Sequence, residues 1–371
     1  MTAGRVTAGP VRVGLIGAGV ISDTYLRNLT GFPDVRVEMV ADLDLDRAAE
    51  KAAEHGVPRS GTVTELLDDP GIELVVNLTV PAAHVEVGFA ALEAGKHVWT
   101  EKPLALHRST ARKLLDRARE LGLRVASAPD TVLGAGLQTA RRAVDEGRIG
   151  EPRTALALFQ SPGPESWHPA PEFLFQEGGG PLLDMGPYYL SQLVHSLGPV
   201  RRVTATGGRA RATRVIGSGP RAGTEFEVTV DTTVTALLEF ARGGSAQLVL
   251  SFDSALPRTG FEVAGTLGTA VLPDPNRFDG STLLYLIGRQ DPVELPPQGH
   301  AASRGTGVLE LARAIRAGVP ERASGEFAYH VLDTMQAIEE SIAEGRPVPV
   351  DTTVETTPAL PVDWDPYART L

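Results

Sequence analysis

The stretch VRVGLIGAG, residues 11–19, decides the fold of the first part of this chain. It is a run of β-branched and other apolar residues that ends in glycines, and the helix-like ISDTYLRNL follows after Val20. Gly17, Gly19 and Ser22 fill a GxGxxG pattern in which serine takes the last place. In this pattern the first glycine permits a tight turn, and the second lets the backbone approach a pyrophosphate at the start of the next helix. We therefore expect a dinucleotide site whose contacts include Gly17, Gly19, Val20 and Ile21.

The same alternation of strand and helix continues to about residue 129. VRVEMVAD leads into LDRAAEKAAEHG, IELVVNLT leads into PAAHVEVGFAALEAG, and KHVWTE and LRVASAPD are separated by a helix-like segment from His107 to Leu121. Near-continuous apolar strands that alternate with helices indicate a parallel sheet covered on both faces. The sequence therefore predicts a doubly wound α/β Rossmann domain over residues 1–129.

Asp42 ends the second predicted strand, roughly 20 residues after the glycines, where an acid takes the ribose hydroxyl of a dinucleotide. A 2′-phosphate would be repelled by this carboxylate, so NAD is favoured. Arg47 could bind such a phosphate, which leaves NADP possible. For Asp44 and Asp46 we prefer the roles of helix N-cap and first-turn acid.

Composition excludes several classes of protein. The 371 residues carry 35 basic and 46 acidic side chains, a net charge of −11, and the basic residues are dispersed. A surface for nucleic acid or an anionic membrane would need a basic patch. There is no cysteine, so disulfides and thiolate metal sites are excluded. MTAGRVTAGPVRVG lacks the apolar core of a signal peptide, and no pair of histidines has the spacing of metal ligands. We expect a cytoplasmic protein without a metal.

Lys102 lies in WTEKPLA, residues 99–105, at the end of the fifth predicted strand. The carboxyl ends of the strands face the crevice in which open α/β sheets bind their ligands. Pro103 disfavours a helical conformation for Lys102 and favours an extended one. Beside a nicotinamide, its ammonium group can hold a substrate hydroxyl or carbonyl oxygen. The alternative is a surface lysine paired with Glu101.

A second domain is predicted over residues 130–371, after the alternation lapses. GLQTARRAVDEGRIG is one helix that closes at Gly147, and β segments with short turns extend from Arg201 to about Gly288. Thr229 to Phe240 and Ser245 to Asp253 form the clearest hairpin, and Val331 to Gly345 is a late helix. This order predicts an α+β domain with a mostly antiparallel open sheet. The proline- and glycine-rich segment SPGPESWHPAPEFLFQEGGGP is a predicted loop.

The sequence resembles the Gfo/Idh/MocA family of oxidoreductases in GLIGAGVIS, in AD at residues 41–42, in ALEAGKHVWTEKPLA and in GGGPLLDMGPYYL. The resemblance implies that Lys102 is catalytic, binds substrate and lies near the nicotinamide. It implies that the face of the second sheet forms the interface of a homo-dimer or homo-tetramer. It also implies that the cofactor is lined by Thr79, Pro81, His84 and Glu101, although the role of His84 could be only structural.

The family pattern D-x-G-x-H is matched by Asp184 and Gly186, but Tyr188 takes the place of the histidine. Tyrosine titrates near pH 10 and exchanges a proton at neutral pH less easily than histidine does. Tyr188 could be the acid/base itself, or position substrate while Lys102 carries the proton, or be a half-buried helix aromatic. Another histidine could also take over this role. His195 lies ~16 Å along the helix, which is too far, and His168 can do so only if its loop folds over the crevice.

Asp130 and His168 complete the candidate substrate-binding residues, with Lys102, Asp184 and Tyr188; His168 requires its loop to fold over the crevice. The resulting prediction is an NAD(P)-dependent oxidoreductase that transfers hydride between the nicotinamide and a secondary alcohol or carbonyl of a sugar, inositol or related polyol. The alternatives are NAD-assisted glycoside cleavage by oxidation and elimination, and a non-catalytic sensor of NAD or sugar.

Overall fold

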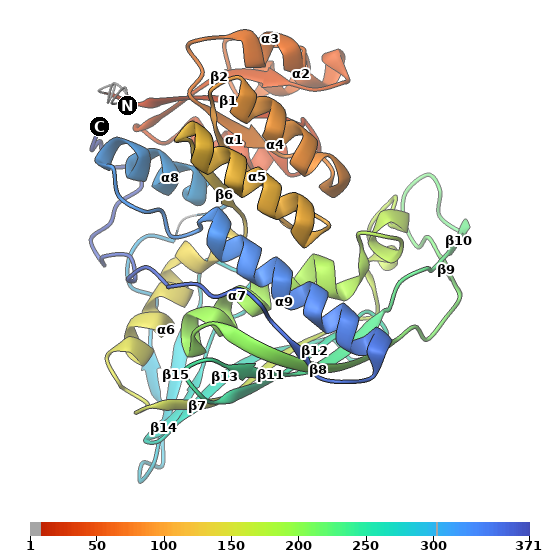
Figure 1. Ribbon diagram of the computed structural model, residues 1–371, viewed down its shortest axis with the longest axis vertical. Helices are drawn as coiled ribbons and strands as arrows, with labels where there is room; N and C mark the ends of the chain where they lie inside the picture. The colour runs from red at the N-terminus through yellow and green to blue at the C-terminus, as the bar shows by residue number, and fades with distance from the viewer. Residues whose placement is uncertain (1–8, 302) are drawn as a thin grey trace. The chain divides into compact units, whose positions relative to one another are not determined.

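The structure, a computed structural model, describes residues 9–301 and 303–371 (Figure 1). The prediction that the chain lacks a signal peptide rests mainly on residues 1–8, which lie outside the described residues. Two compact units divide the chain. The first contains the residues up to Gly134 together with Gly299–Tyr329 and Leu360–Leu371, and the second contains Ala135–Gln298 and His330–Ala359.

The first unit is built on a six-stranded sheet in the order β3-β2-β1-β4-β5-β6, and every neighbouring pair of strands is parallel. This is the doubly wound order that the sequence predicts. The strands are β1 (Val11–Ile16), β2 (Val35–Ala41), β3 (Ser60–Gly61), β4 (Leu74–Asn77), β5 (His97–Thr100) and β6 (Val125–Ser127). The helices between them are α1 (Ser22–Leu29), α2 (Leu45–Glu54), α3 (Val63–Asp68), α4 (His84–Glu93) and α5 (Arg108–Leu121), with short 3₁₀ turns η1 (Pro81–Ala83) and η2 (Asp130–Leu133).

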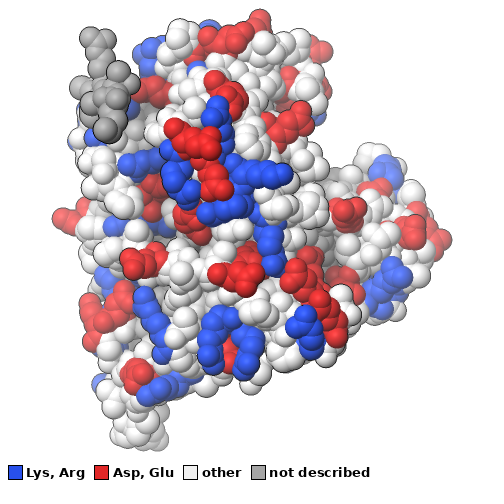
Figure 2. All heavy atoms as spheres, in the orientation of Figure 1, with Lys and Arg blue, Asp and Glu red and all other residues white. Residues whose placement is uncertain are grey.

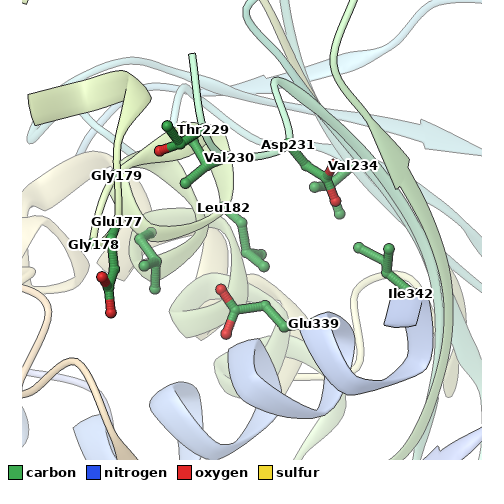
Figure 3. A pocket seen from close by; sticks show the side chains of 12 residues that line it. Glu177, Gly178, Gly179, Leu182, Thr229, Val230, Asp231, Val234, Glu339 and Ile342 are labelled. Atoms are coloured by element: carbon green, nitrogen blue, oxygen red, sulfur yellow. The ribbon is translucent and has the colours of Figure 1, made fainter. Parts of the chain in front are cut away.

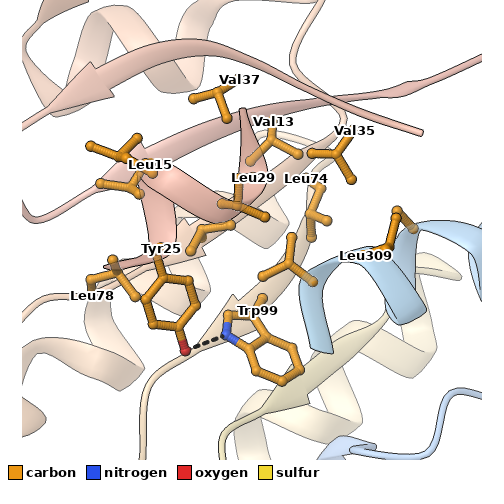
Figure 4. Packing of buried hydrophobic residues seen from close by; sticks show 14 of the residues in the cluster. Val13, Leu15, Tyr25, Leu29, Val35, Val37, Leu74, Leu78, Trp99 and Leu309 are labelled. Carbon is orange, nitrogen blue, oxygen red and sulfur yellow. Dashed lines mark hydrogen bonds between the residues drawn. The ribbon is translucent and has the colours of Figure 1, made fainter. Parts of the chain in front are cut away.

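A helix from far along the chain completes this unit. Helix α8 (Thr306–Ala317) places its apolar side, including Leu309, in the same buried cluster as α1 and the strands (Figure 4). Gly307 permits this packing, because a Cβ there would lie 2.0 Å from the ring of Trp99. The predicted boundary at residues 129/130 therefore differs from the observed division, since residues 299–329 and 360–371 pack with the first unit. Sequence order alone did not reveal that the Rossmann sheet is covered by a returning segment.

The second unit contains a nine-stranded sheet in the order β16-β15-β14-β13-β7-β12-β11-β8-β17. One neighbouring pair of these strands, β7 with β12, is parallel, and the others are antiparallel. The strands are β7 (Pro152–Gln160), β8 (Val200–Gly208), β11 (Thr233–Phe240), β12 (Ser245–Ser251), β13 (Arg258–Gly265), β14 (Gly268–Val271), β15 (Thr282–Leu286), β16 (Val293–Leu295) and β17 (Val348–Pro349). The mostly antiparallel sheet is confirmed.

Helices and a small second sheet accompany the nine strands. Helices α6 (Ala135–Asp145) and α7 (Gly180–Leu197) belong to this unit, and α9 (Gly325–Glu344) begins in the first unit and continues here. The segment before α7 contains the 3₁₀ turns η3 (Pro164–Ser166) and η4 (Glu172–Phe175), and β9 (Thr213–Val215) pairs with β10 (Glu225–Glu227). The predicted hairpin is β11–β12, with Glu239 opposite Ser245 across the turn. Within the described residues, no helix combines the length and apolarity that crossing a bilayer requires.

Candidate cofactor and substrate site

The turn between β1 and α1 has the geometry that the glycine pattern predicts. Gly17 has φ +102°, a conformation that favours glycine, and a Cβ there would lie 2.7 Å from the backbone of Leu78. At Gly19 a Cβ would meet nothing within 4 Å, so the space over the turn is open. Val20 is exposed beside it, and Ile21 is the N-cap residue of α1. Ser22 is buried, and its hydroxyl donates to the Gly19 carbonyl at 2.6 Å.

Asp42 is tied to this turn through both of its carboxylate oxygens. Oδ2 accepts from the backbone amide of Ala18 at 2.6 Å, while Oδ1 accepts from the amide of Asp44 at 2.9 Å and from Arg47 Nη2 at 2.6 Å. Burial by itself would raise the pKa of Asp42, but these hydrogen bonds outweigh it and lower that pKa. Asp42 is therefore ionised at neutral pH. As expected, Asp44 caps α2, accepting from the Arg47 amide at 3.1 Å.

The end of β4 is held by a polar network. The side chain of Asn77 donates to the His84 carbonyl at 3.0 Å and accepts from the amide and hydroxyl of Thr79. The ring of His84 lies between two carbonyls, with Nδ1 2.8 Å from the oxygen of Pro103 and Nε2 3.0 Å from that of Thr79. Burial lowers the pKa of His84. These contacts favour a structural role for His84, whereas Thr79 and Pro81 are partly exposed.

Lys102 directly follows β5, on the same edge of the parallel sheet as the glycine turn and Asp42. It is partly buried, as is Glu101. The Glu101 carboxylate accepts from the hydroxyl of Tyr25 at 2.8 Å and from the backbone amide of Lys102 at 3.0 Å. The backbone at Lys102 is thus fixed by the residue before it.

Asp130 is 2% exposed, and its Oδ2 accepts from the backbone amides of Gly305 at 2.8 Å and Gly307 at 3.1 Å. Burial raises the pKa of Asp130 to about 6, and the nearby charge of Glu101 adds to this rise. The carboxylate lies at the start of α8. Its burial and bonds favour a structural role over the substrate contact that we predicted for it.

In the second unit, Asp184 and Tyr188 lie one turn apart on α7. Asp184 is partly exposed and Tyr188 is buried. On the same helix, Nδ1 of His195 lies 2.7 Å from a guanidinium nitrogen of Arg141, and burial lowers the pKa of this histidine well below its ordinary value. These contacts agree with the structural role expected for His195.

His168 belongs to an anchored loop. Its Nδ1 accepts from the amide of Ala170 at 3.1 Å, and its ring meets those of Trp167 and Phe173 edge-on. The loop is anchored by the buried guanidinium of Arg214, which pairs with Glu165 and Asp253 and donates to the carbonyls of Pro162 and Phe252 at 2.9 Å each. The pattern of prolines predicted the loop but not this arginine, which lies far away in sequence.

A pocket of about 440 Å³ in the second unit was not predicted (Figure 3). Its wall includes the glycines before α7, the apolar side chains of Leu182 and Val230, and the carboxylates of Glu177, Asp231 and Glu339. Carboxylates are hydrogen-bond acceptors only, so this wall suits a ligand that carries hydroxyl or ammonium donors.

Two groups of charged side chains in the first unit pair among themselves. Arginines on α5, among them Arg112, Arg117 and Arg119, form ion pairs with acids such as Glu93 and Glu326, and both signs of charge intermingle on the face in Figure 2. Asp23, Glu54 and His55 lie close enough to hold a metal ion. However, the single ammonium of Lys51 pairs with Asp23 at 2.6 Å and with Glu54 at 2.9 Å, so a cation of the chain itself already offsets part of the charge of these acids.

Comparison with known proteins agrees with this geometry. The family model described as the oxidoreductase family with an NAD-binding Rossmann fold matches residues 11–128, and the GFO/IDH/MocA C-terminal domain matches residues 137–271. The chain belongs to the Gfo/Idh/MocA family.

Its relatives in this family include a trans-1,2-dihydrobenzene-1,2-diol dehydrogenase of Bos taurus, 30% identical over 77% of this chain and 81% of the relative. A 1,5-anhydro-D-fructose reductase of Ensifer adhaerens is 30% identical over 92% of this chain and 99% of the relative. Among solved structures, an NAD-binding oxidoreductase from Klebsiella pneumoniae is 25% identical and has a TM-score of 0.81. The match covers 93% of this chain and 100% of that protein.

The first unit of this Gfo/Idh/MocA protein is an NAD-binding Rossmann domain. Its residues fit the cofactor, because the open space at Gly19 lies over the start of α1, where the backbone amides can receive a pyrophosphate. Bound NAD supplies a nicotinamide that accepts a hydride, and NADH returns one. Val20, Ile21 and Asp42 stand around the same turn, at the positions predicted for cofactor contacts.

Proposed function

We propose that this protein transfers hydride between NAD and a secondary alcohol or carbonyl of a sugar, inositol or related polyol. One observation carries the proposal: Lys102, the glycine turn and Asp42 all lie where parallel strands of one sheet end, and this edge is where open α/β sheets bind their ligands. The names of two relatives support the substrate class, since they act on a diol and on an anhydro sugar. Dependence on NADP is a weaker option, because Asp42 is ionised.

In this proposal Lys102 holds the substrate oxygen and relays its proton. Asp184 orients substrate, and Tyr188 binds the substrate or moves a proton. The support for the last two is their match to the family pattern and their spacing on one side of α7. His168 is proposed as a further substrate contact from its loop. The absence of cysteine fits a reducing compartment, and cytoplasmic action is part of the proposal.

The test of Lys102 is its replacement by methionine, which has a similar length and no charge. NADH absorbance is followed with NAD and a panel of sugars, inositols and their ketones. We expect Lys102→Met to lose about 10²- to 10⁴-fold in kcat, the usual contribution of general acid–base catalysis. Lys113→Met, at an exposed position of α5, is the matched control and should be unaffected. Equal activity of the two variants would exclude the proposed role.

Tyr188 is tested by removing only its hydroxyl. Tyr188→Phe should lose about 10²- to 10⁴-fold in turnover if the phenol moves a proton, whereas a loss below tenfold would limit it to positioning. Tyr189→Phe is the control, because Tyr189 is also a buried tyrosine of α7.

The presence of Tyr188 in place of the family histidine keeps one other reaction open. In NAD-assisted glycoside cleavage, the substrate gives a hydride to NAD, and a base such as the phenolate of Tyr188 takes the acidified neighbouring proton. The leaving group departs with a proton, water adds to the double bond that forms, and NADH returns the hydride to the carbonyl. This function would show tightly retained NAD, cleavage of glycosides and no net production of NADH. Tight NAD binding without turnover of any polyol or glycoside would instead support a sensor.

A further inference from the structure

The hydroxyl of Tyr25 lies in the core of the Rossmann unit, within hydrogen-bond distance of Glu101, the residue before Lys102. Tyr25 is on α1 and is fully buried among apolar side chains of the sheet and α8 (Figure 4). Its oxygen lies 3.2 Å from the indole nitrogen of Trp99 on β5 and 2.8 Å from a carboxylate oxygen of Glu101. Tyr25 lies in the helix-like segment ISDTYLRNL but is not part of the glycine pattern or of WTEKPLA.

The direction of these hydrogen bonds follows from the chemistry of the groups. The indole N–H of Trp99 is a donor only, so the phenol oxygen of Tyr25 accepts from it. The phenol must then give its own hydrogen to Glu101. Burial, followed by the charges of Glu101 and Asp130, raises the pKa of Tyr25 well above its ordinary value, so the hydrogen remains on the phenol. The chain of bonds therefore runs in one direction, from Trp99 through Tyr25 to Glu101.

This chain ends at the proposed catalytic lysine. The second carboxylate oxygen of Glu101 accepts from the backbone amide of Lys102 at 3.0 Å. Donors at both oxygens restrict rotation of the Glu101 side chain, and the carboxylate in turn fixes the backbone from which Lys102 extends. On the other side of Lys102, the carbonyl of Pro103 contacts the buried ring of His84 at 2.8 Å. The backbone on both sides of Lys102 is thus held by contacts with Glu101 and His84.

We propose that Tyr25 is a positioning residue, which holds Glu101 and, through it, Lys102 in the conformation required for turnover. This proposal rests on the function proposed above for Lys102. Phenylalanine would fill the same apolar space, so packing alone does not require the hydroxyl. Without the hydroxyl, Glu101 loses the donor to its Oε1 atom, and the peptide at Lys102 gains freedom to move.

Tyr25→Phe should lower kcat about 10- to 100-fold, since small displacements of a reacting group have effects of this size. KM for the substrate and Kd for NADH should change less than about threefold, because the glycine turn is untouched. Tyr189→Phe, which also removes a buried phenol, is the matched control and should keep full activity. A kcat within about twofold of the unmodified protein would overturn the proposal, provided that thermal melting shows Tyr25→Phe to be folded.

A double-mutant cycle shows whether Tyr25 acts through Glu101. Leucine has no acceptor oxygen, so Glu101→Leu removes both bonds. If Tyr25 acts through Glu101, the double variant should be no slower than Glu101→Leu alone. Losses that multiply independently would contradict the proposal.

A readout that needs no substrate separates this inference from the proposed function. Lys102 and Lys113 are acetylated with acetic anhydride, and the rates are compared by mass spectrometry. We expect Tyr25→Phe to change the rate at Lys102 severalfold and to leave the rate at Lys113 unchanged. If Lys102→Met keeps full activity, the function proposed for Lys102 is wrong, and an altered labelling rate still supports its tethering through Tyr25. An unaltered rate at Lys102 would exclude the tethering itself.

Discussion

At the scale of single residues, Asp42 holds the glycine turn, and we propose that it also selects the cofactor. It binds the amide of Ala18 and also pairs with Arg47. Asp42→Ala should relax the preference for NAD over NADP by at least about tenfold, or ~1.4 kcal/mol. The repulsive carboxylate disappears, and Arg47 is released to meet a 2′-phosphate. The measurement is the ratio of kcat/KM for the two cofactors. Asp46→Ala is the control, because Asp46 is an exposed acid on α2, beside Arg47. An unchanged ratio would show that Asp42 does not contact the ribose.

Three of the residues that the sequence predicted for the site share a local signal. Gly17, Asp42 and Lys102 each follow a strand, so their position at the sheet edge can be read from the few residues before them. Tyr25 could not be found in this way, because its partner Glu101 is 76 positions away, and neither could the bond between Asp130 and Gly305, 175 positions apart. Side-chain contacts of this kind depend on which segments the fold brings together.

At the scale of elements, α8 depends on the buried carboxylate of Asp130. The pKa of Asp130 rises from 3.8 in the unfolded chain to about 6 in the folded protein. At pH values between these two, the carboxyl group is protonated in the folded state and ionised in the unfolded state. The free energy of unfolding should therefore fall as pH rises through about 4 to 6, by up to about 3 kcal/mol from this group.

Asp130→Asn should remove this pH dependence. A side-chain amide oxygen can still accept from Gly305 and Gly307, while no proton is exchanged. Urea unfolding across this pH range, followed by circular dichroism, measures the difference, and Asp46→Asn serves as the control. If the difference in unfolding free energy between Asp130→Asn and the unmodified protein does not vary with pH, the raised pKa of Asp130 is wrong.

Two elements, β7 and α8, were not predicted from the sequence, for different reasons. Strand β7 is central in the nine-stranded sheet, yet TALALFQ mixes small and large apolar residues and gives weak strand alternation. Helix α8 has an ordinary apolar side, but its place on the Rossmann sheet depends on the return of the chain after the second unit. Parallel strands buried on both faces were easier to predict, because their apolar runs are continuous.

At the scale of the whole molecule, one face of the nine-stranded sheet is a candidate interface between copies of the chain. Helix α7 packs beside buried side chains of this sheet, such as Ala157 and Leu248. The positions that alternate with these form rows across neighbouring strands. In one row Gln247 lies between Leu156 and Leu237, and in the next row Leu158 lies opposite Val249. Leu237 is 45% exposed, and the side chains of Leu156, Leu158 and Val249 are partly exposed. This face, defined by these five residues, is therefore apolar in several places.

We propose that a second copy of the chain covers this face in a homo-dimer or homo-tetramer, as the resemblance to the family implies. A stable interface buries about 800 Å² on each partner, and a charge at its centre without a partner is costly to bury. Leu237→Arg should therefore shift the protein to a monomer in light scattering after gel filtration. Val215→Arg should keep the assembly, because Val215 is 51% exposed on the separate two-stranded sheet. If the unmodified protein runs as a monomer, or if both variants stay assembled, this face is not the interface. Because Leu237 is exposed within its own unit, the arginine can reach water there, so loss of assembly without loss of thermal stability would identify the face as the interface between copies.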